Sequence, residues 1–321
     1  MNIDTFNIII GNATDVGQMR EHNEDYMAHF ETPFGYCIIV CDGMGGHAAG
    51  DIASQGAIDS IKRYLQDGKV TMLDTPNSIQ NAIEFANYKL REMVKQNQAL
   101  YGMGTTCVLA LFQKTEMFIA HAGDSRLYLI RNNKIEQLSK DHSTVQNLID
   151  AGVLTASEAL VSEKRNQITK AIGIFDKVDP TVTKEAIGLK QNDKILLCSD
   201  GLTAHVSDAE IQEIVNANAD VQDAALKLIE KANAGGGSDN ITVQLIQYNG
   251  KSFNDNKKSH KKKIIKMVSI PILIILMILF AYQQWGTKLF KKVMKKETVV
   301  PVKSDVNVSY DSIVEIEKHA E

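Results

Sequence analysis

Aspartates in five separate stretches of this 321-residue chain are its most informative residues. Asp42 directly follows an apolar run at 36–41, and Asp200 follows another at 194–199. Carboxylates at strand ends can converge on one point, where they repel one another unless a cation joins them. Oxygen-only clusters suit hard divalent ions such as Mg²⁺ or Mn²⁺. The pattern predicts a carboxylate metal centre that handles phosphate, built from Asp25, Asp42, Asp124, Asp200 and Asp239.

The competing interpretation of these residues is that they are ordinary turn residues. Asp-Gly is a common turn signal, and any single Asp here fits a turn better than a metal site. Turns alone do not explain why Asp42 and Asp200 both end apolar strands. They also leave the short spacing between Arg20 and the pair Glu24-Asp25 unexplained.

Eight short motifs in a fixed order make the chain resemble the bacterial form of the metal-dependent serine/threonine protein phosphatases of type 2C. They span roughly residues 8–247, and their number makes the resemblance specific. In chain order they are Arg20-x-x-x-Glu24-Asp25, Val40-Cys41-Asp42-Gly43-Met44-Gly45-Gly46-His47, Gly104-Thr105-Thr106, Gly123-Asp124-Ser125-Arg126, Asp141-His142-Ser143, Thr169-Lys170-Ala171-Ile172-Gly173, Ser199-Asp200-Gly201-Leu202 and Ser238-Asp239-Asn240-Ile241-Thr242.

The resemblance implies an α+β fold, a four-layer α-β-β-α sandwich of two antiparallel sheets with the metals at one end. It also implies two Mn²⁺ or Mg²⁺ ions and a third, weaker one. Asp42 would bridge the pair beside the carbonyl of Gly43, Asp200 and Asp239 would complete one shell, and Asp124 with Asp200 would form the third site. The implied metal ligands are therefore Glu24, Asp25, Asp42, Gly43, Asp124, Asp200 and Asp239.

The implied catalytic residues besides Asp42 are Arg20 and His47. A guanidinium fork suits Arg20 to clamp a phosphoryl group, although Arg20 could instead pair with Glu24 at helical spacing. Eukaryotic relatives place a histidine two residues after the bridging Asp, where this chain has Met44. His47 could supply the proton for the leaving oxygen or could only open the following helix, and a metal-bound water is a further donor.

The charge distribution bears on possible nucleic-acid partners, and the cysteine content bears on the redox compartment. Residues 1–250 carry 21 Lys+Arg against 32 Asp+Glu, whereas residues 251–321 carry 14 against 7. The acidic first part argues against a nucleic-acid partner. Four scattered cysteines without a Cys-x-x-Cys pair indicate free thiols in a reducing compartment. The first residues lack the features of a secretory signal, so we expect a cytoplasmic domain.

Periodicity predicts the elements that must position these residues. Residues 54–65 and 78–94 have the apolar spacing of amphipathic helices. Residues 104–113, 115–122, 125–131 and 134–138 are short strand-like pieces that suggest one antiparallel meander. Thr155-x-x-Glu158 and Ser207-x-x-Glu210 are typical capping boxes. The polar helical stretch 143–165 corresponds, by the resemblance, to a variable flap beside the active site, and an ordinary surface connection is an equal alternative.

The character of the chain changes after residue 250. Residues 251–263 form a basic linker, 264–285 a predicted transmembrane helix, and 286–321 a short charged tail, after a catalytic domain at 1–250. The 22 residues of this predominantly apolar span would reach roughly 33 Å as a helix, enough to cross a hydrocarbon core of about 30 Å. Six lysines precede the span and five follow it, so the charge rule hardly sets its orientation.

Together these features predict a monomeric, single-pass membrane phosphatase with a cytoplasmic catalytic domain. It would hydrolyse phosphoserine and phosphothreonine by attack of a metal-bridging water and would oppose a cognate bacterial Ser/Thr kinase and its substrates. The alternative is a catalytically silent phosphoprotein-binding scaffold at the membrane, which would be expected to lose ligands that are present here. A metal-dependent phosphodiesterase or nuclease is disfavoured by the acidic domain.

Overall fold

The computed structural model describes residues 2–45, 49–67 and 74–251, together with Met277, Gln283 and Trp285. The chain divides into two units, Met1–Lys258 and Ser259–Glu321, and the description below concerns the first. In the described part of the chain we find no helix that has both the length and the apolar character to cross a bilayer. The predicted span 264–285 lies outside the described residues except for Met277, Gln283 and Trp285, and it therefore stays a prediction.

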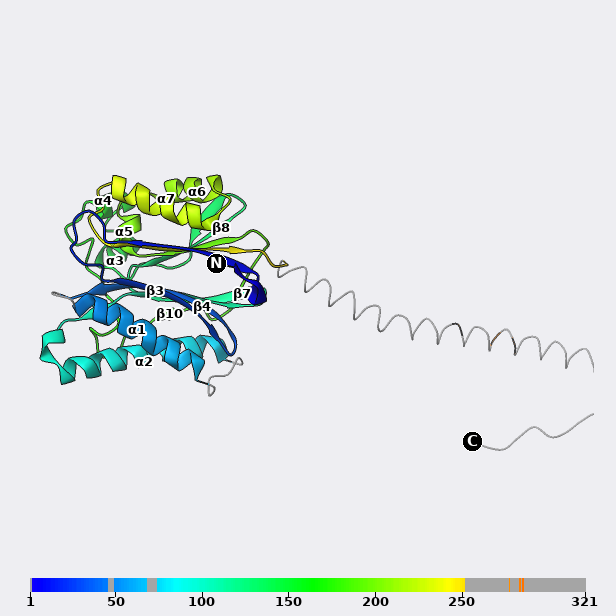
Figure 1. Ribbon diagram of the computed structural model, residues 1–321, viewed down its shortest axis with the longest axis horizontal. Helices are drawn as coiled ribbons and strands as arrows, with labels where there is room; N and C mark the ends of the chain where they lie inside the picture. Colours follow the sequence, from blue (N-terminus) through cyan, green and yellow to red (C-terminus); the bar gives the residue numbers. More distant parts are fainter. Residues whose placement is uncertain are drawn as a thin grey trace, which may run out of the picture. The chain divides into compact units, whose positions relative to one another are not determined.

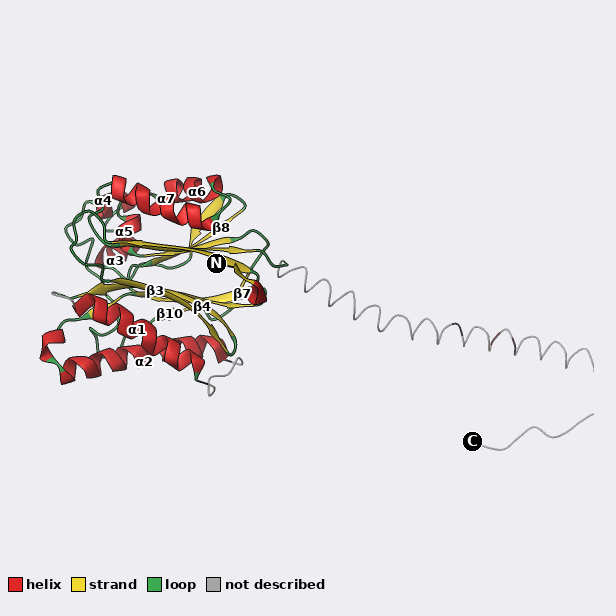
Figure 2. Ribbon diagram, viewed as in Figure 1, coloured by secondary structure: helices red, strands yellow, loops and turns green. Residues whose placement is uncertain are grey.

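Two antiparallel sheets lie face to face at the centre of the fold (Figure 2). The six-stranded sheet has, in spatial order, β1 (Asn2–Ile3), β2 (Ile8–Asp15), β13 (Ile241–Tyr248), β12 (Lys194–Cys198), β8 (Arg126–Arg131) and β9 (Lys134–Gln137). The seven-stranded sheet has β10 (Thr181–Val182), β7 (Glu116–Ala122), β6 (Cys107–Gln113), β4 (Gly35–Met44) and β3 (Asp25–Thr32), with β11 (Ile187–Gly188) on β7 and β5 (Gly104–Thr105) on β4.

Helices cover the outer face of each sheet (Figure 1). The long pair α1 (Ala49–Gln66) and α2 (Thr75–Gln96) covers the seven-stranded sheet, and α6 (Asp208–Ala217) with α7 (Val221–Ala234) covers the six-stranded one. Shorter helices lie in the connections: α3 (Thr144–Asp150), α4 (Ala156–Leu160), α5 (Asp200–Thr203), and the 3₁₀ turns η1 (Asp4–Phe6) and η3 (Gln98–Leu100).

Three separate apolar clusters match this four-layer order. One lies between α1, α2 and the seven-stranded sheet, a second between α6, α7 and the six-stranded sheet, and a third between the sheets. The buried residues of β4 explain why its sheet lies inside the sandwich. A strand with apolar side chains on both faces must be covered on both, here by helices on one face and by the other sheet on the second. The expectation of an α+β fold with two antiparallel sheets is confirmed.

Local capping signals are confirmed, whereas the predicted meander is wrong. Both capping boxes form, on Thr155 and on Ser207. The strand-like pieces of 104–138 do not form one meander, since β6 and β7 pair in one sheet and β8 and β9 in the other. The chain crosses between the sheets at 123–125, and the alternation of apolar residues could not reveal this because it is the same for either sheet.

A buried amide links the two sheets. Gln244 on β13 is fully buried, and its Nε2 donates to the carbonyl oxygens of Ala28 (3.2 Å) and Ile39 (2.7 Å) on the facing sheet. Hydrogen bonds of this kind fix the relative position of layers that apolar contacts alone would let slide.

We therefore expect Gln244→Ala to lower the free energy of unfolding by about 2–4 kcal/mol, since it leaves a cavity and unpaired groups between the sheets. The matched control is Gln247→Ala on the same strand, whose amide contacts the exposed Asn249; it should change stability by less than about 0.5 kcal/mol. Urea unfolding of both variants measures the difference, and equal losses would contradict the role given to Gln244.

Candidate metal centre

The first two carboxylates are brought together by strand register. Asp25 opens β3 and lies directly opposite Asp42 near the end of β4. Asp25 is buried, and its Oδ2 accepts a hydrogen bond from Ser199 Oγ at 2.7 Å. Ser199 follows β12 of the other sheet, so this one bond joins the two sheets at the end where the carboxylates gather.

Asp200 and Asp239 enter from the six-stranded sheet. Asp200 is the first residue of α5, directly after Ser199, and its carboxyl is hydrogen-bonded to that of Asp42. Asp239 lies two residues before β13. Its Oδ1 accepts the N–H of Asn240 at 2.8 Å and its Oδ2 accepts from Arg20 at 2.8 Å.

Asp124 joins the group from the crossing between the sheets. It lies between β7 and β8, and its carboxylate interacts electrostatically with those of Asp42 and Asp200. All five sequence-predicted aspartates therefore come together at one end of the sandwich; we call them the acid cluster: Asp25, Asp42, Asp124, Asp200 and Asp239.

Desolvation and mutual repulsion dominate the electrostatics of the acid cluster. The pKa of Asp25 is raised to about 7, chiefly by burial and also by the charges of Asp200 and Asp239, against the lowering effect of hydrogen bonds from Ser199 and Thr242. Burial and the Asp200 charge raise the pKa of Asp124 to about 8. The pKa of Asp42 lies well above its ordinary value for the same two reasons. Carboxylates this close cannot all be ionised without a counter-charge.

Unpaired oxygens indicate that a cation fits the acid cluster. Asp25 Oδ1 and Asp200 Oδ1 are buried without a hydrogen-bond partner, which is costly unless something else contacts them. Among the described residues, no three His, Cys, Asp or Glu side chains are arranged to hold an ion as they stand. Cation binding would need Asp42 and Asp200 in their ionised forms, which the raised pKa of each opposes in the metal-free protein.

Glu24 and Gly43 lie beside the acid cluster against the start of α1. The carboxylate of Glu24 accepts the N–H of Gly50 at the N-terminal end of that helix, and burial is the largest cause of its raised pKa. The N–H of Gly43 donates to the carbonyl of Glu24 at 3.1 Å. A Cβ at Gly43 would lie 2.1 Å from the carbonyl oxygen of Gly50, so only glycine lets strand and helix approach this closely.

Arg20 lies at the exposed side of the acid cluster, with 46% of its side chain accessible. Residues 18–24 form no helix, so the alternative pairing of Arg20 with Glu24 at helical spacing is wrong; its ion pair is with Asp239. His47 belongs to residues 46–48, outside the described residues, so its predicted role stays a prediction.

The geometry agrees with comparisons with known proteins. A family model described as "Protein phosphatase 2C" matches residues 33–241. The chain belongs to the protein phosphatase 2C family. The protein phosphatase PhpP of Streptococcus pneumoniae is 40% identical over 241 residues, which cover 74% of this chain and 96% of the relative.

Solved structures agree with this assignment. The serine/threonine phosphatase Stp1 from Staphylococcus aureus superposes with a TM-score of 0.72 at 35% identity, over 78% of this chain and 98% of that one. The catalytic domain of the phosphatase PstP, solved in complex with two manganese ions, superposes with a TM-score of 0.67 at 34% identity, over 75% and 97%. The resemblance drawn from the motifs is confirmed.

Residues that support the acid cluster of this phosphatase 2C domain were not assigned from the sequence. Thr106 Oγ1 accepts the N–H of Asp42 at 3.0 Å and lies 2.6 Å from Ser125 Oγ, next to Asp124. The side chain of Asn240 spans the loop before β3, accepting from Glu24 N–H and donating to two carbonyls. The sequence reveals the motifs that contain Thr106 and Asn240, but it does not reveal which atoms these side chains bond.

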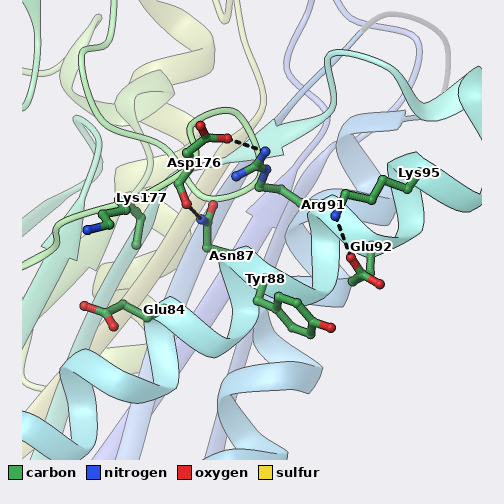
Figure 3. A pocket seen from close by; sticks show the side chains of 9 residues that line it. Glu84, Asn87, Tyr88, Arg91, Glu92, Lys95, Asp176 and Lys177 are labelled. Atoms are coloured by element: carbon green, nitrogen blue, oxygen red, sulfur yellow. Dashed lines mark hydrogen bonds and ion pairs between the residues drawn. The ribbon is translucent and has the colours of Figure 1, made fainter.

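A second support reaches the acid cluster from α2. Asn87 Oδ1 accepts the N–H of Gly173 at 2.7 Å, and its Nδ2 donates to the Phe175 carbonyl at 3.1 Å. Ile172, the residue before Gly173, forms an antiparallel β-bridge with Thr105. The Oγ1 of Thr105 in turn donates to the carbonyl of Asp42. The groove of about 350 Å³ beside Asn87 (Figure 3) lies along α2, and none of the acid cluster lines it.

The raised pKa values predict an unusual pH dependence of the metal-free phosphatase domain. The folded state holds the protons of Asp25 and Asp124 more tightly than the unfolded chain does. Their contribution to stability is complete below about pH 4 and is lost as the pH rises through about 7 and 8. We expect stability in chelator to fall between pH 5 and 8, and Mn²⁺ to oppose the fall.

Urea unfolding at several pH values measures this slope. Asp25→Asn should flatten it, because the variant has no proton to lose at that position. Asp59→Asn, on the exposed face of α1, is the matched control and should keep it. A stability that rises with pH in chelator would contradict the predicted repulsion.

Proposed function

We propose that this chain is a membrane-tethered, Mn²⁺- or Mg²⁺-dependent phosphatase that removes phosphate from serine and threonine residues of proteins. The observation that carries the proposal is the convergence of five aspartates from both sheets on one partly open end of a phosphatase 2C fold. Its substrates would be phosphorylated proteins, including a bacterial Ser/Thr kinase and that kinase's targets.

The proposed ligand roles are those that the family resemblance implies, and the positions of the residues in the fold support them. Asp42 would bridge two ions beside the carbonyl of Gly43, and its electrostatic interaction with Asp25, Asp200 and Asp124 supports this role. Asp200 and Asp239 lie on the side of the six-stranded sheet, whereas Glu24 and Asp25 lie toward α1 and β3. Asp124, whose pKa the charge of Asp200 raises, would hold a third ion together with Asp200. When bound, the ions supply Lewis acidity toward phosphoryl oxygens and activation of water.

Arg20 is the proposed clamp for the phosphoryl group. It is half-exposed beside the acid cluster and uses Nη2 on Asp239, which leaves its remaining N–H groups for phosphate oxygens. Asp239 holds the guanidinium in place at the entrance, so binding needs little further ordering of the side chain. His47 is the proposed proton donor to the leaving oxygen, because an imidazole titrates near neutral pH.

Hydrolysis of a phosphothreonine peptide tests the activity. With Mn²⁺ we expect turnover by the intact chain, none in chelator, and at least a 100-fold lower rate for Asp42→Ala or Asp239→Ala, because each removes a carboxylate that would hold an ion. Asp59→Ala, an exposed aspartate of α1, is the control and should keep the full rate.

The scaffold alternative predicts a different set of results. A silent binding module would bind the phosphopeptide without turning it over, and Asp42→Ala would leave that binding unchanged. Absence of turnover in the intact chain with Mn²⁺, combined with retained peptide binding, would replace the phosphatase proposal with the scaffold.

Strand β13 separates the acid cluster from the point at which the described domain ends. This strand begins at Ile241, two residues after Asp239, and ends at Tyr248, seven residues on, a rise of about 23 Å at roughly 3.3 Å per residue. Its far end pairs with Ile8, and the described domain ends at Lys251 (Figure 1). The proposed linker at 251–263 would thus continue the chain from the end of β13 that is far from Asp239.

Membrane attachment is testable with a charge in the proposed anchor. We expect the intact chain to stay with membranes after an alkaline carbonate wash, and Leu276→Arg to release much of it, since an arginine at the centre of a span costs about 2.5–3.5 kcal/mol. Val302→Arg in the tail is the control and should remain attached. An intact chain found wholly in the soluble fraction would remove the anchor from the proposal.

The orientation of the anchor needs its own measurement. A reporter that is active only outside the cytoplasm, fused after Glu321, should be active if the domain is cytoplasmic and the tail is exported. Activity of a cytoplasm-only reporter at the same position would reverse the proposed topology.

A further inference from the structure

The motif Asp141-His142-Ser143 has no part in the site described so far. Two of its residues, Asp141 and His142, form hydrogen bonds with the turn that carries Asp124. The carboxylate of Asp141 receives three hydrogen bonds from the guanidinium of Arg126, at 2.7, 3.0 and 3.1 Å. Arg126 is two residues after Asp124. Asp141 thus holds the turn on the side that follows Asp124, and His142 holds it on the side that precedes Asp124.

His142 hydrogen-bonds both backbone polar groups of Gly123, the N–H and the carbonyl. Its backbone N–H donates to the carbonyl of Gly123 at 2.9 Å, and its Nδ1 lies 3.3 Å from the amide nitrogen of Gly123. An N–H can only donate, so Nδ1 is the acceptor and the ring proton is on Nε2, which lies 2.9 Å from Thr181 Oγ1. Both polar atoms of the ring are therefore used in holding Gly123 to β10.

The surroundings of His142 keep its ring neutral. It stacks on the buried ring of His121 with centroids 4.5 Å apart and an interplanar angle of 18°. Burial, with the nearby charge of Lys170, lowers the pKa of His142 to about 4. The acceptor at Nδ1 is therefore available at neutral pH.

The turn at Gly123 needs this outside support. Gly123 has a φ of +110°, and a Cβ there would meet the side chain of Thr106 at 2.6 Å, so no side chain of its own can anchor it. The Thr106–Ser125 contact holds the turn from the side of β6. His142 holds it from the side of β10.

The segment 143–168 begins and ends at the same point. Ser143 caps α3 through its Oγ and forms a β-bridge with Ile168, while the N–H of Thr169 donates to the carbonyl of His142 at 2.7 Å. One residue thus contacts both the base of this segment and the turn that carries Asp124.

We propose that His142 is a positioning residue that holds Asp124 for cation binding and couples it to the base of the segment 143–168. The cation part of this inference rests on the proposed function. The geometry predicts that loss of the Gly123–His142 bonds loosens the turn in the metal-free protein and weakens the ion that Asp124 would hold. Ions held without Asp124 should be affected little.

The experiment uses the full chain and two readouts. Hydrogen exchange of the Gly123 amide is measured by NMR in chelator, and Mn²⁺ binding by calorimetry. His142→Phe keeps a ring on His121 but removes both nitrogens, whereas His142→Asn restores a side-chain acceptor near the position of Nδ1. His29→Phe is the matched control, because His29 also stacks and hydrogen-bonds but contacts Tyr36 on β4.

We expect His142→Phe to speed exchange at Gly123 at least tenfold and to weaken the weakest Mn²⁺ event by about 10–100-fold, as outer-shell changes do. The tighter events should stay as they are. His142→Asn should recover most of both effects, and His29→Phe should match the unchanged protein. If His142→Phe does not fold, Thr181→Val, which removes the Nε2 partner, should change both readouts in the same direction.

Two results would overturn the proposal. One is exchange at Gly123 in His142→Phe at the unchanged rate. The other is an equal loss of every Mn²⁺ event in both His142 variants together with lower thermal stability, which would indicate a merely structural histidine. If the unchanged chain binds no Mn²⁺ at all, the proposed function fails instead, and the Gly123 exchange rates alone then decide whether His142 holds the turn.

Discussion

Repulsion among carboxylates at the junction of the two sheets is the constraint on which the rest of the structure depends. Asp25, Asp42 and Asp200 are held close enough that burial and neighbouring charge raise the pKa of each. Neutral polar groups hold them in place: Ser199 donates to Asp25, and Thr106 accepts from the backbone of Asp42. The positive charges of Arg20 and Arg126 lower the pKa of Asp200 without outweighing burial and the charge of Asp239, so negative charge is left for a cation to neutralise.

The sandwich explains why the carboxylates meet at one end. In each sheet two neighbouring strands place an acidic residue at the same end of the sandwich. These are Asp25 and Asp42 on β3 and β4, and Asp200 and Asp239 after β12 and before β13. Stacking the sheets brings the two pairs together, and Gln244 fixes how far one sheet can slide over the other. The apolar layers therefore do more than stabilise the domain, since their alignment sets the distances within the acid cluster.

Sequence reasoning succeeded where local pattern decides and failed where pairing across the chain decides. Asp42 and Asp200 were identifiable because each ends an apolar run, and the caps at Thr155 and Ser207 because their partner lies three residues on. The crossing at Asp124 was missed, because a strand's alternation does not reveal which sheet it joins. The support from Asn87 was invisible for a similar reason, since its partner Gly173 lies 86 residues away.

The unfavourable electrostatics of the acid cluster themselves favour a binding role over a structural one. A domain kept only for its fold would be more stable with uncharged amides at Asp25 and Asp200, because amides would not repel the neighbouring carboxylates. Ionised carboxylates there cost stability unless a cation is present, and a cation that binds only the folded state returns that stability by mass action. The same groups that weaken the metal-free fold are thus the source of its affinity for ions, which ties stability and metal binding to one set of side chains.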